Sequence, residues 1–349
     1  MTLSQKDTNA LKGLGIIMIV LHNVVHQNFG VSENEFSFHQ SNLLNFFANF
    51  MEYPVTSFFS FLGWIGVSLF VFVSGYGLSS KYTYKIDDKA KWTWKHYLKL
   101  VVLLAGGLVL FKLYPLLRDI NAIDFKNLFL EFILLLNITA PGDISPMVYW
   151  YIGMAFQLYI CYLLLRRLSS KILIALIIAD GLALAFLPME YVAYLRHNSP
   201  GWLIEFISGI LAARYSYDIN DKKYRFLLPL LSFMLLILAS FSRFTFFLSG
   251  PFFIFFAIGL NGFLRRQNIL IYLGGISAAL YILHSVVRQV FHYLFLNADF
   301  SISPLMRGVL VLLVSIIFAI PYQKSYNYIC SKIIDKSKPI GLIPSRRRE

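Results

Sequence analysis

The chain is poor in cysteine and in charged residues, and each scarcity excludes a class of protein. Two cysteines in 349 residues, Cys161 and Cys330, are too few for a disulfide framework, and no cysteine–histidine spacing suggests a metal site. Only 14% of the residues are charged, whereas 58% are hydrophobic. A soluble protein of this length could not bury so much apolar surface. The composition therefore indicates a multi-spanning integral membrane protein.

Long polar segments, low-complexity linkers and internal repeats are also missing. We therefore expect one transmembrane domain over residues 1–322, followed by a basic cytoplasmic tail over residues 323–349. No small-residue cleavage site follows the first apolar segment, which favours a retained helix over a signal peptide. The net charge of +13 comes without an RNA- or DNA-binding motif, so we expect no nucleic-acid partner.

The chain is rich in apolar segments, and ten of them suggest membrane helices. Their approximate bounds are 11–25, 56–80, 97–114, 147–165, 172–187, 201–213, 226–241, 244–264, 270–295 and 305–322. The predicted fold class is all-α, with about ten transmembrane helices. Residues 115–146 also carry apolar side chains at helical spacing, which predicts an amphipathic helix on the outer membrane surface or over a cavity.

Lysine and arginine are concentrated in alternate loops, and residues 26–55 contain neither. The positive-inside rule places basic loops in the cytoplasm. The distribution therefore predicts that both termini are cytoplasmic. It also accounts for most of the net positive charge.

His22 is the most informative residue of the first apolar segment. In a helix it lies about 15 Å from Leu11, which predicts a position close to mid-bilayer. An ionisable group at that depth is expensive and indicates function. It suits proton abstraction from a hydroxyl or a proton relay in a transporter. The structural alternative is a neutral imidazole hydrogen-bonded between helices.

Other polar residues fall within the predicted spans or near their ends. Asp180 and Glu205 are candidates to orient the imidazole of His22, as a carboxylate does in a catalytic triad. Segment 270–295 has a polar helix face with residues three or four positions apart: Ser277, Tyr281, His284, Arg288 and His292. Such a stripe predicts either the wall of a water-filled cavity or a polar seam between helices.

Three stretches of sequence carry a family resemblance. They are Leu11-Lys12-Gly13 followed by His22, the glycine- and serine-containing segment 66–76, and segment 273–284, which ends in Tyr281-Ile282-Leu283-His284. Trp150-Tyr151-Ile152-Gly153 is a weaker fourth stretch. In order and spacing these motifs resemble those of the acyltransferase family 3 membrane proteins, the O-acyltransferases of bacterial surface glycans. The chain looks like a stand-alone transmembrane form without the SGNH-type domain that some members carry.

This resemblance implies transfer of an acyl group, acetyl above all, from cytoplasmic acyl-CoA to a hydroxyl of a surface glycan or lipid-linked sugar. His22 would be the catalytic residue, as general base or as transient acyl carrier. Acyl-CoA is then a donor substrate, and no bound cofactor is expected. The implied location is the bacterial cytoplasmic membrane, with a homo-oligomer as one option.

Basic residues at the cytoplasmic ends of the first three helices are the candidates for binding the CoA phosphates. They are Lys12, Lys95, His96 and Lys99. The family has arginine at its opening basic position and an arginine pair before the third helix. This chain therefore lacks arginine's bidentate fork there, and the same four residues serve equally as a topology signal.

Six second-tier residues are expected to line the path through the protein or to orient His22. They are Ser74, Asp180, Glu205, Tyr281, His284 and Arg288. Two other functions fit the same pattern. One is a transporter or flippase for a polysaccharide or lipid-linked intermediate, although the inverted repeats or paired broken helices that favour transport are not evident. The other is a membrane module that anchors glycan-synthesis enzymes.

Overall fold

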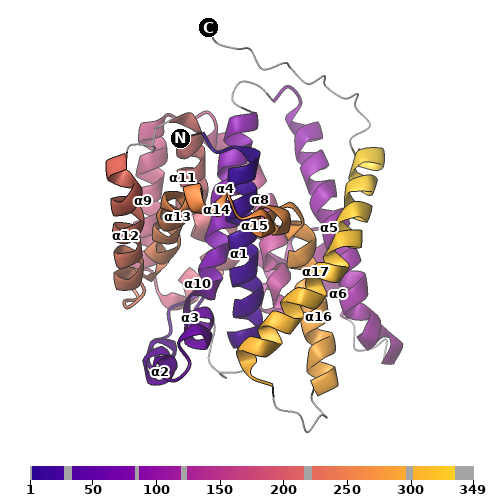
Figure 1. Cartoon of the computed structure of the whole chain (residues 1–349). Helices are drawn as coiled ribbons and strands as arrows, with labels where there is room; N and C mark the ends of the chain where they lie inside the picture. Colours follow the sequence, from indigo (N-terminus) through magenta and orange to yellow (C-terminus); the bar gives the residue numbers. More distant parts are fainter. Residues whose placement is uncertain are drawn as a thin grey trace.

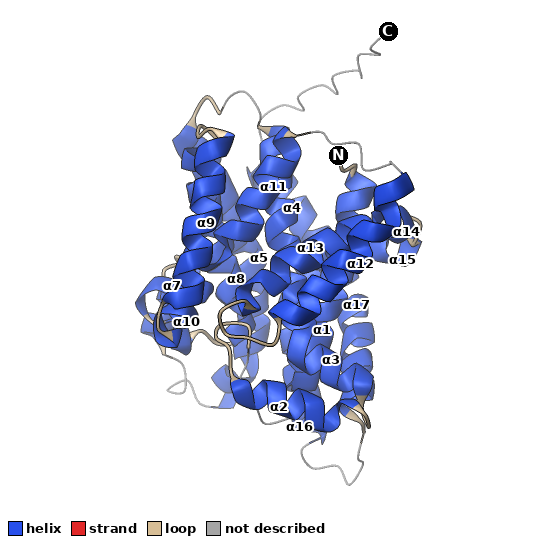
Figure 2. Cartoon of the chain, turned by 90° about the vertical axis from the view of Figure 1, so that its left-hand side faces the viewer, coloured by secondary structure: helices blue, strands red, loops and turns tan. Residues whose placement is uncertain are grey.

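The computed structural model describes residues 2–26, 34–82, 86–118, 124–215, 222–295 and 302–334. The start of α1 (Gln5–Val25) and the end of α17 (Pro304–Ile329) lie at the same end of a helical bundle (Figure 1). Every regular element in the described ranges is helical, and none is a strand (Figure 2). The predicted all-α fold class is confirmed.

The bounds of the remaining α-helices follow chain order. They are α2 (Gln40–Phe50), α3 (Pro54–Leu62), α4 (Gly66–Lys81), α5 (Lys89–Arg118), α6 (Phe125–Phe132), α7 (Leu136–Thr139), α8 (Trp150–Leu165), α9 (Ser170–Phe186), α10 (Met189–His197), α11 (Leu203–Arg214), α12 (Lys222–Ala239), α13 (Ser249–Gly259), α14 (Asn261–Leu264), α15 (Asn268–Gly275) and α16 (Ser277–Phe295). A short 3-10 helix, η2 (Gly63–Ile65), joins α3 to α4.

Four stretches of the described chain are helical, long and apolar enough to cross a membrane: Gln5–Val25, Pro54–Lys81, Lys89–Leu113 and Pro304–Lys332. α15 and α16 form a fifth candidate span if the pair, bent by 78°, is counted as one. The protein is thus a membrane protein, but the predicted count of ten spans is not confirmed. Several predicted spans fold as short helices. The 12 residues of α11, for example, extend about 18 Å, against about 30 Å for the bilayer core.

α1 lies at the centre of the bundle, in contact with α3, α4, α15, α16 and α17. A capping box fixes its start: the Asp7 N–H donates to Ser4 Oγ, and the Ser4 N–H donates to Asp7 Oδ2 at 2.7 Å. The helix therefore begins well before Leu11, and His22 falls in its last turn. His22 lies about 10 Å beyond the midpoint of this helix, and its mid-bilayer depth stays a prediction.

Glycines allow α1 to approach α4 and η2 closely. A Cβ on Gly66 would lie 2.6 Å from the Gly15 carbonyl oxygen, and one on Gly15 would lie 2.8 Å from the Gly66 oxygen. A Cβ on Gly63 would lie 2.6 Å from the Cβ of His22. The small residues therefore bring the backbone of η2 and α4 directly against the helix that carries His22.

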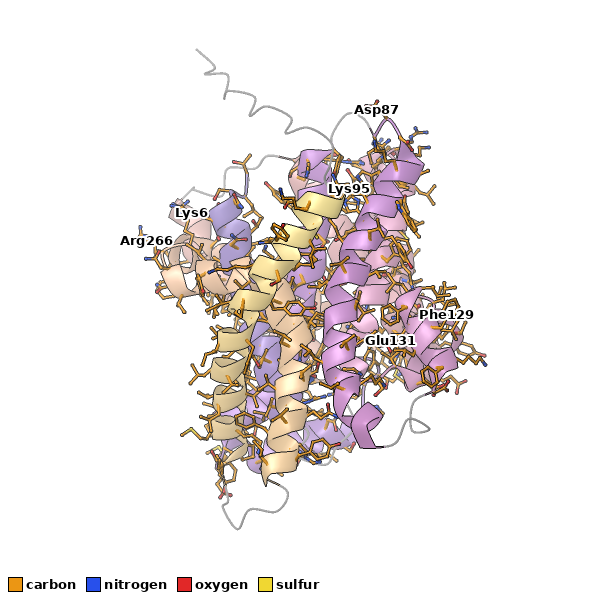
Figure 3. The ribbon with its side chains drawn as sticks, turned by 90° about the vertical axis from the view of Figure 1, so that its right-hand side faces the viewer. Lys6, Asp87, Lys95, Phe129, Glu131 and Arg266 are labelled. Atoms are coloured by element: carbon orange, nitrogen blue, oxygen red, sulfur yellow. The ribbon has the colours of Figure 1, made fainter. Side chains whose placement is uncertain are left out.

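The helix predicted within residues 115–146 forms as α6, with apolar side chains both on its inner and on its outer side. Phe129 is 63% exposed, whereas Glu131 is 7% exposed and faces the protein. Both residues lie part-way along the bundle beside α5, not at its tip (Figure 3), and the Tyr97 hydroxyl of α5 donates to the Phe132 carbonyl. α6 is thus a peripheral helix that packs Leu128, Leu130 and Phe132 against the core and leaves Phe129 exposed. Residues 119–123 of this segment, residues 27–33 and most of the predicted tail, 335–349, lie outside the described residues.

Candidate active site

His22 is buried, with one ring nitrogen fixed and the other open. Nδ1 lies 2.9 Å from the backbone carbonyl oxygen of Phe59 in α3. Because a carbonyl can only accept, Nδ1 carries the proton and the lone pair of the neutral imidazole lies on Nε2. Nε2 is buried and has no hydrogen-bond partner among the described residues. The side chain therefore presents an oriented basic nitrogen inside the protein.

His26 repeats this arrangement one helical turn further along α1. Its Nδ1 donates to the Ser60 carbonyl oxygen at 3.1 Å, and the two imidazole centroids are 5.1 Å apart. Nε2 of His26 is likewise buried without a partner in the described part of the chain. Sequence reasoning missed His26 as a functional residue, although its spacing of four from His22 places both rings on one helix face.

His284 and Arg288 of the predicted polar stripe reach α1 through a single residue, Asn23. The Asn23 amide donates to His284 Nε2 at 3.3 Å, and His284 Nδ1 donates back to the Leu280 carbonyl. Arg288 donates to the Asn23 backbone oxygen at 2.9 Å. The structure thus brings both predicted residues to the neighbour of His22. His292, at the end of the stripe, is exposed.

The predicted donor-binding residues of α5 form a basic and aromatic cluster. His96 packs on Trp92 with 4.0 Å between ring centroids and on Tyr159 of α8 with 5.0 Å. The charges of Lys95 and Lys99 act on His96, as does that of Lys81, which was not predicted. Lys95, Lys6 and Arg266 mark the same end of the bundle, which we call the basic end (Figure 3).

Lys12, the fourth predicted donor-binding residue, stands apart from this cluster. It is half-buried on α1, next to Gly13, where α15 packs so closely that a Cβ on Gly13 would collide with the Leu270 backbone.

A row of hydroxyl-bearing side chains leads from the basic cluster towards His284; Tyr159, Tyr151 and Tyr281 form this tyrosine row. Tyr151 lies two turns from Tyr159 on α8, and its ring lies 5.2 Å from that of Tyr281. The Tyr281 ring lies 5.8 Å from that of His284. Ser74, Tyr151 and Tyr159 each keep part of their surface accessible. The predicted residues Tyr281 and His284 therefore continue a series of ring contacts that begins at Tyr151.

A comparison with known protein families identifies the family of this chain. A family model described as an acyltransferase domain, that of acyltransferase family 3, matches residues 6–323. The chain belongs to this family. No curated protein and no solved structure matches it. The match confirms the resemblance drawn from the motifs and supports an acyltransferase; it does not favour a transporter.

Asp180 and Glu205 do not orient His22 in this acyltransferase. The Nδ1 partner of His22 is the Phe59 carbonyl, whereas the charges of Glu205 and Asp180 act on the buried guanidinium of Arg196. Ser68 donates to Glu205 Oε1 at 3.2 Å. The two acidic residues therefore serve a second buried cluster built around Arg196.

Arg196 is 4% exposed, and sequence reasoning missed it. Its guanidinium lies 4.0 Å above the Trp202 ring centroid and 5.0 Å from that of Trp64, and its Nε donates to the Glu35 carbonyl oxygen at 2.6 Å. The signal was available, because Arg196 is a basic residue in a loop that the positive-inside rule places outside. Trp64 follows Gly63, so this cluster adjoins the wall against which His22 packs.

Metal ligands are sparse in the described part of the acyltransferase. Within these residues, no group of three or more histidine, cysteine, aspartate or glutamate side chains is placed to hold a metal ion. The candidate site is therefore defined by its histidines, the tyrosine row and the basic cluster.

Proposed function

We propose that this membrane acyltransferase transfers an acyl group, acetyl in particular, from cytoplasmic acyl-CoA to a hydroxyl of a surface glycan or lipid-linked sugar. The observation that carries the proposal is the buried Nε2 of His22, whose lone pair is left open because Nδ1 is held by the Phe59 carbonyl. A nitrogen of this kind is what general-base or nucleophilic catalysis needs. The corresponding location is the bacterial cytoplasmic membrane.

The basic cluster is the proposed donor site. Lys95 and Lys99 supply positive charge for the CoA phosphates at the basic end, with His96 between them and Lys12 as a further contact from α1. The tyrosine row supports this arrangement because α8 carries both Tyr159, which contacts His96, and Tyr151, which contacts Tyr281 beside His284. Both ends of the reaction would then be connected through the bundle.

Two roles of His22 use the same atom. As general base, Nε2 takes the proton of the acceptor hydroxyl while its oxygen attacks the acyl carbonyl carbon. The C–S bond then breaks, and the departing thiolate takes up a proton. As a carrier, Nε2 itself attacks the acyl carbon, the C–S bond breaks, and the departing thiolate takes up a proton. The acceptor hydroxyl oxygen then attacks the acyl carbon, the N–C bond breaks, and the hydroxyl proton passes to the freed Nε2. We favour the base role because it needs no covalent intermediate.

Replacing His22 tests the proposal. His22→Gln and His22→Ala are expected to lower transfer of radiolabelled acetyl from acetyl-CoA to cell-surface glycan about 100-fold or more, at matched protein level in the membrane. His292→Gln is the matched control, since His292 is an exposed histidine of α16, and it should retain activity. Wild-type acetylation by His22→Ala would contradict a reactive role for His22.

A further inference from the structure

A small polar pocket lies beside His26, at the end of α1 remote from the basic end. We call it the His26 pocket. Its polar lining consists of His26, Asn42, Asn45, Ser57 and Ser60, and two phenylalanine rings complete the wall. α2 and α3, which supply most of this lining, lie at the end of the bundle opposite the start of α1 (Figure 1). The pocket has room for a group about the size of a water molecule.

Two buried polar atoms in this pocket have no partner in the described part of the protein. His26 is 3% exposed, and its Nδ1 proton is already donated to Ser60, so Nε2 can only accept. Ser57 is also 3% exposed, and its Oγ makes no hydrogen bond with any described residue. A buried polar group left unpaired costs about 1–3 kcal/mol, so two in one pocket indicate a site for a polar group.

The chemistry of the two atoms selects the group. His26 Nε2 needs a donor, and Ser57 Oγ can donate to an acceptor. A hydroxyl answers both at once, because its hydrogen can be donated to the imidazole while its oxygen accepts from the serine. A carbonyl would leave His26 Nε2 unsatisfied, and an ammonium would leave the serine hydrogen without an acceptor.

We infer that the His26 pocket is a subsite for one hydroxyl of the acceptor glycan, adjacent to the hydroxyl that is acylated. The inference rests on the proposed acyl transfer at His22. The imidazole centroids are 5.1 Å apart, and a sugar carries hydroxyls on neighbouring carbons. One hydroxyl bound between His26 and Ser57 would therefore keep a neighbouring hydroxyl of the same sugar within a few ångströms of the His22 ring. His26 acts here as a binding and positioning residue, with no proton transfer of its own.

The test uses the purified full-length protein with acetyl-CoA and the methyl glycosides of glucose, galactose and N-acetylglucosamine as probes. Ser57→Ala and His26→Gln are compared with Thr56→Val, which removes a hydroxyl from the neighbouring residue that does not line the pocket. Loss of one neutral hydrogen bond predicts a rise of about fivefold or more in glycoside KM and Kd. The Kd for acetyl-CoA should not change, and Thr56→Val should resemble the wild type.

The possible outcomes separate the subsite from the proposed function. Unchanged glycoside KM and Kd in both pocket variants would overturn the subsite and leave acyl transfer standing, with the pocket holding an ordered water only. An increased Kd for acetyl-CoA with unchanged glycoside values would also overturn it. Glycoside binding that depends on Ser57 without any acetyl transfer would support the subsite and contradict the proposed function. Neither binding nor transfer with any of the three glycosides would overturn both.

Discussion

Backbone carbonyls decide which nitrogen of each key histidine is free. Phe59 holds His22 and Ser60 holds His26, and both oxygens come from α3. The sequence identifies His22 because an ionisable residue in an apolar helix is conspicuous. It cannot identify the tautomer, because the residue that sets it lies 37 positions away and acts through its main chain. A sequence displays side chains but not main-chain contacts, so a carboxylate was the only kind of partner for His22 that it could suggest.

Loss of a single charge in the basic cluster should weaken donor binding. Lys99→Ala is expected to raise the Kd for acetyl-CoA about three- to tenfold, with a larger effect at low ionic strength, because a charged phosphate contact is lost. His96→Ala should also raise this Kd, but without the dependence on ionic strength, because it removes no charge. Lys126→Ala, an exposed lysine of α6, is the control. Titration calorimetry on the purified variants measures the change. Unchanged affinity in both would place the donor elsewhere.

Glu131 gives a pH dependence that can be measured on the folded protein. Burial raises the pKa of its carboxyl to about 8, against an opposing effect of the Lys112 charge. Between its ordinary pKa of 4.5 and about 8, the folded state therefore binds more protons than the unfolded state, and stability falls as pH rises through that window. Glu131→Gln cannot ionise, so its melting temperature in detergent should decline less from pH 5 to pH 8 and exceed that of the wild type at pH 8. Parallel melting curves for the two proteins would contradict the burial effect.

At the scale of the element, apolar periodicity predicted where helices occur but not where they break. Segment 56–80 is interrupted by η2, and segment 270–295 bends by 78° at Ile276. The hydrophobic pattern continues through both breaks and so gives no sign of them. Both breaks lie where the chain packs closely against α1. Gly63 faces His22, and a Cβ on Gly274 would collide with the Asn9 backbone. The glycines were visible in the sequence, but their partners were not.

The crossing of α1 and α4 should tolerate no side chain. Gly66→Ala places a Cβ 2.6 Å from the Gly15 carbonyl oxygen and is expected to destabilise the protein by about 1–3 kcal/mol, seen as a lower melting temperature and reduced transfer. Gly77→Ala on the same helix is the matched control, because a Cβ there meets nothing within 4 Å. It should be neutral, or stabilising by about 0.5–1 kcal/mol. Equal stability of the two variants would show that the crossing is loosely packed.

At the scale of the whole molecule, charge was a better guide than segment counting. Lys6, Lys95 and Arg266 are far apart in sequence and yet lie at one end of the bundle (Figure 3), as the alternation of basic loops predicts. The number of spans was less predictable, because a short apolar helix packed inside a bundle has the same composition as a membrane span. Pairings such as α4 with α11 depend on close contacts, for example between Gly209 and the Phe72 backbone, that no local pattern encodes.

Chemical labelling can test the predicted orientation. Met51 lies just after α2, and its side chain is 90% exposed. In a Cys161→Ser, Cys330→Ser background, an impermeant maleimide should therefore label Met51→Cys in intact cells. Lys91→Cys, on the exposed start of α5, should be labelled only after permeabilisation. The reverse pattern, or labelling of both in intact cells, would contradict cytoplasmic termini.

The last turn of α1 joins two walls that belong to different parts of the chain. His22 and His26 are tied to α3, while Asn23 between them donates to His284 and accepts from Arg288 on α16. A displacement of either wall therefore pulls on the same short stretch, residues 22–26. Any opening that admits a substrate must carry α3 and α16 together with α1, or break one of these bonds. Access to the two histidines therefore depends on the joint position of α1, α3 and α16.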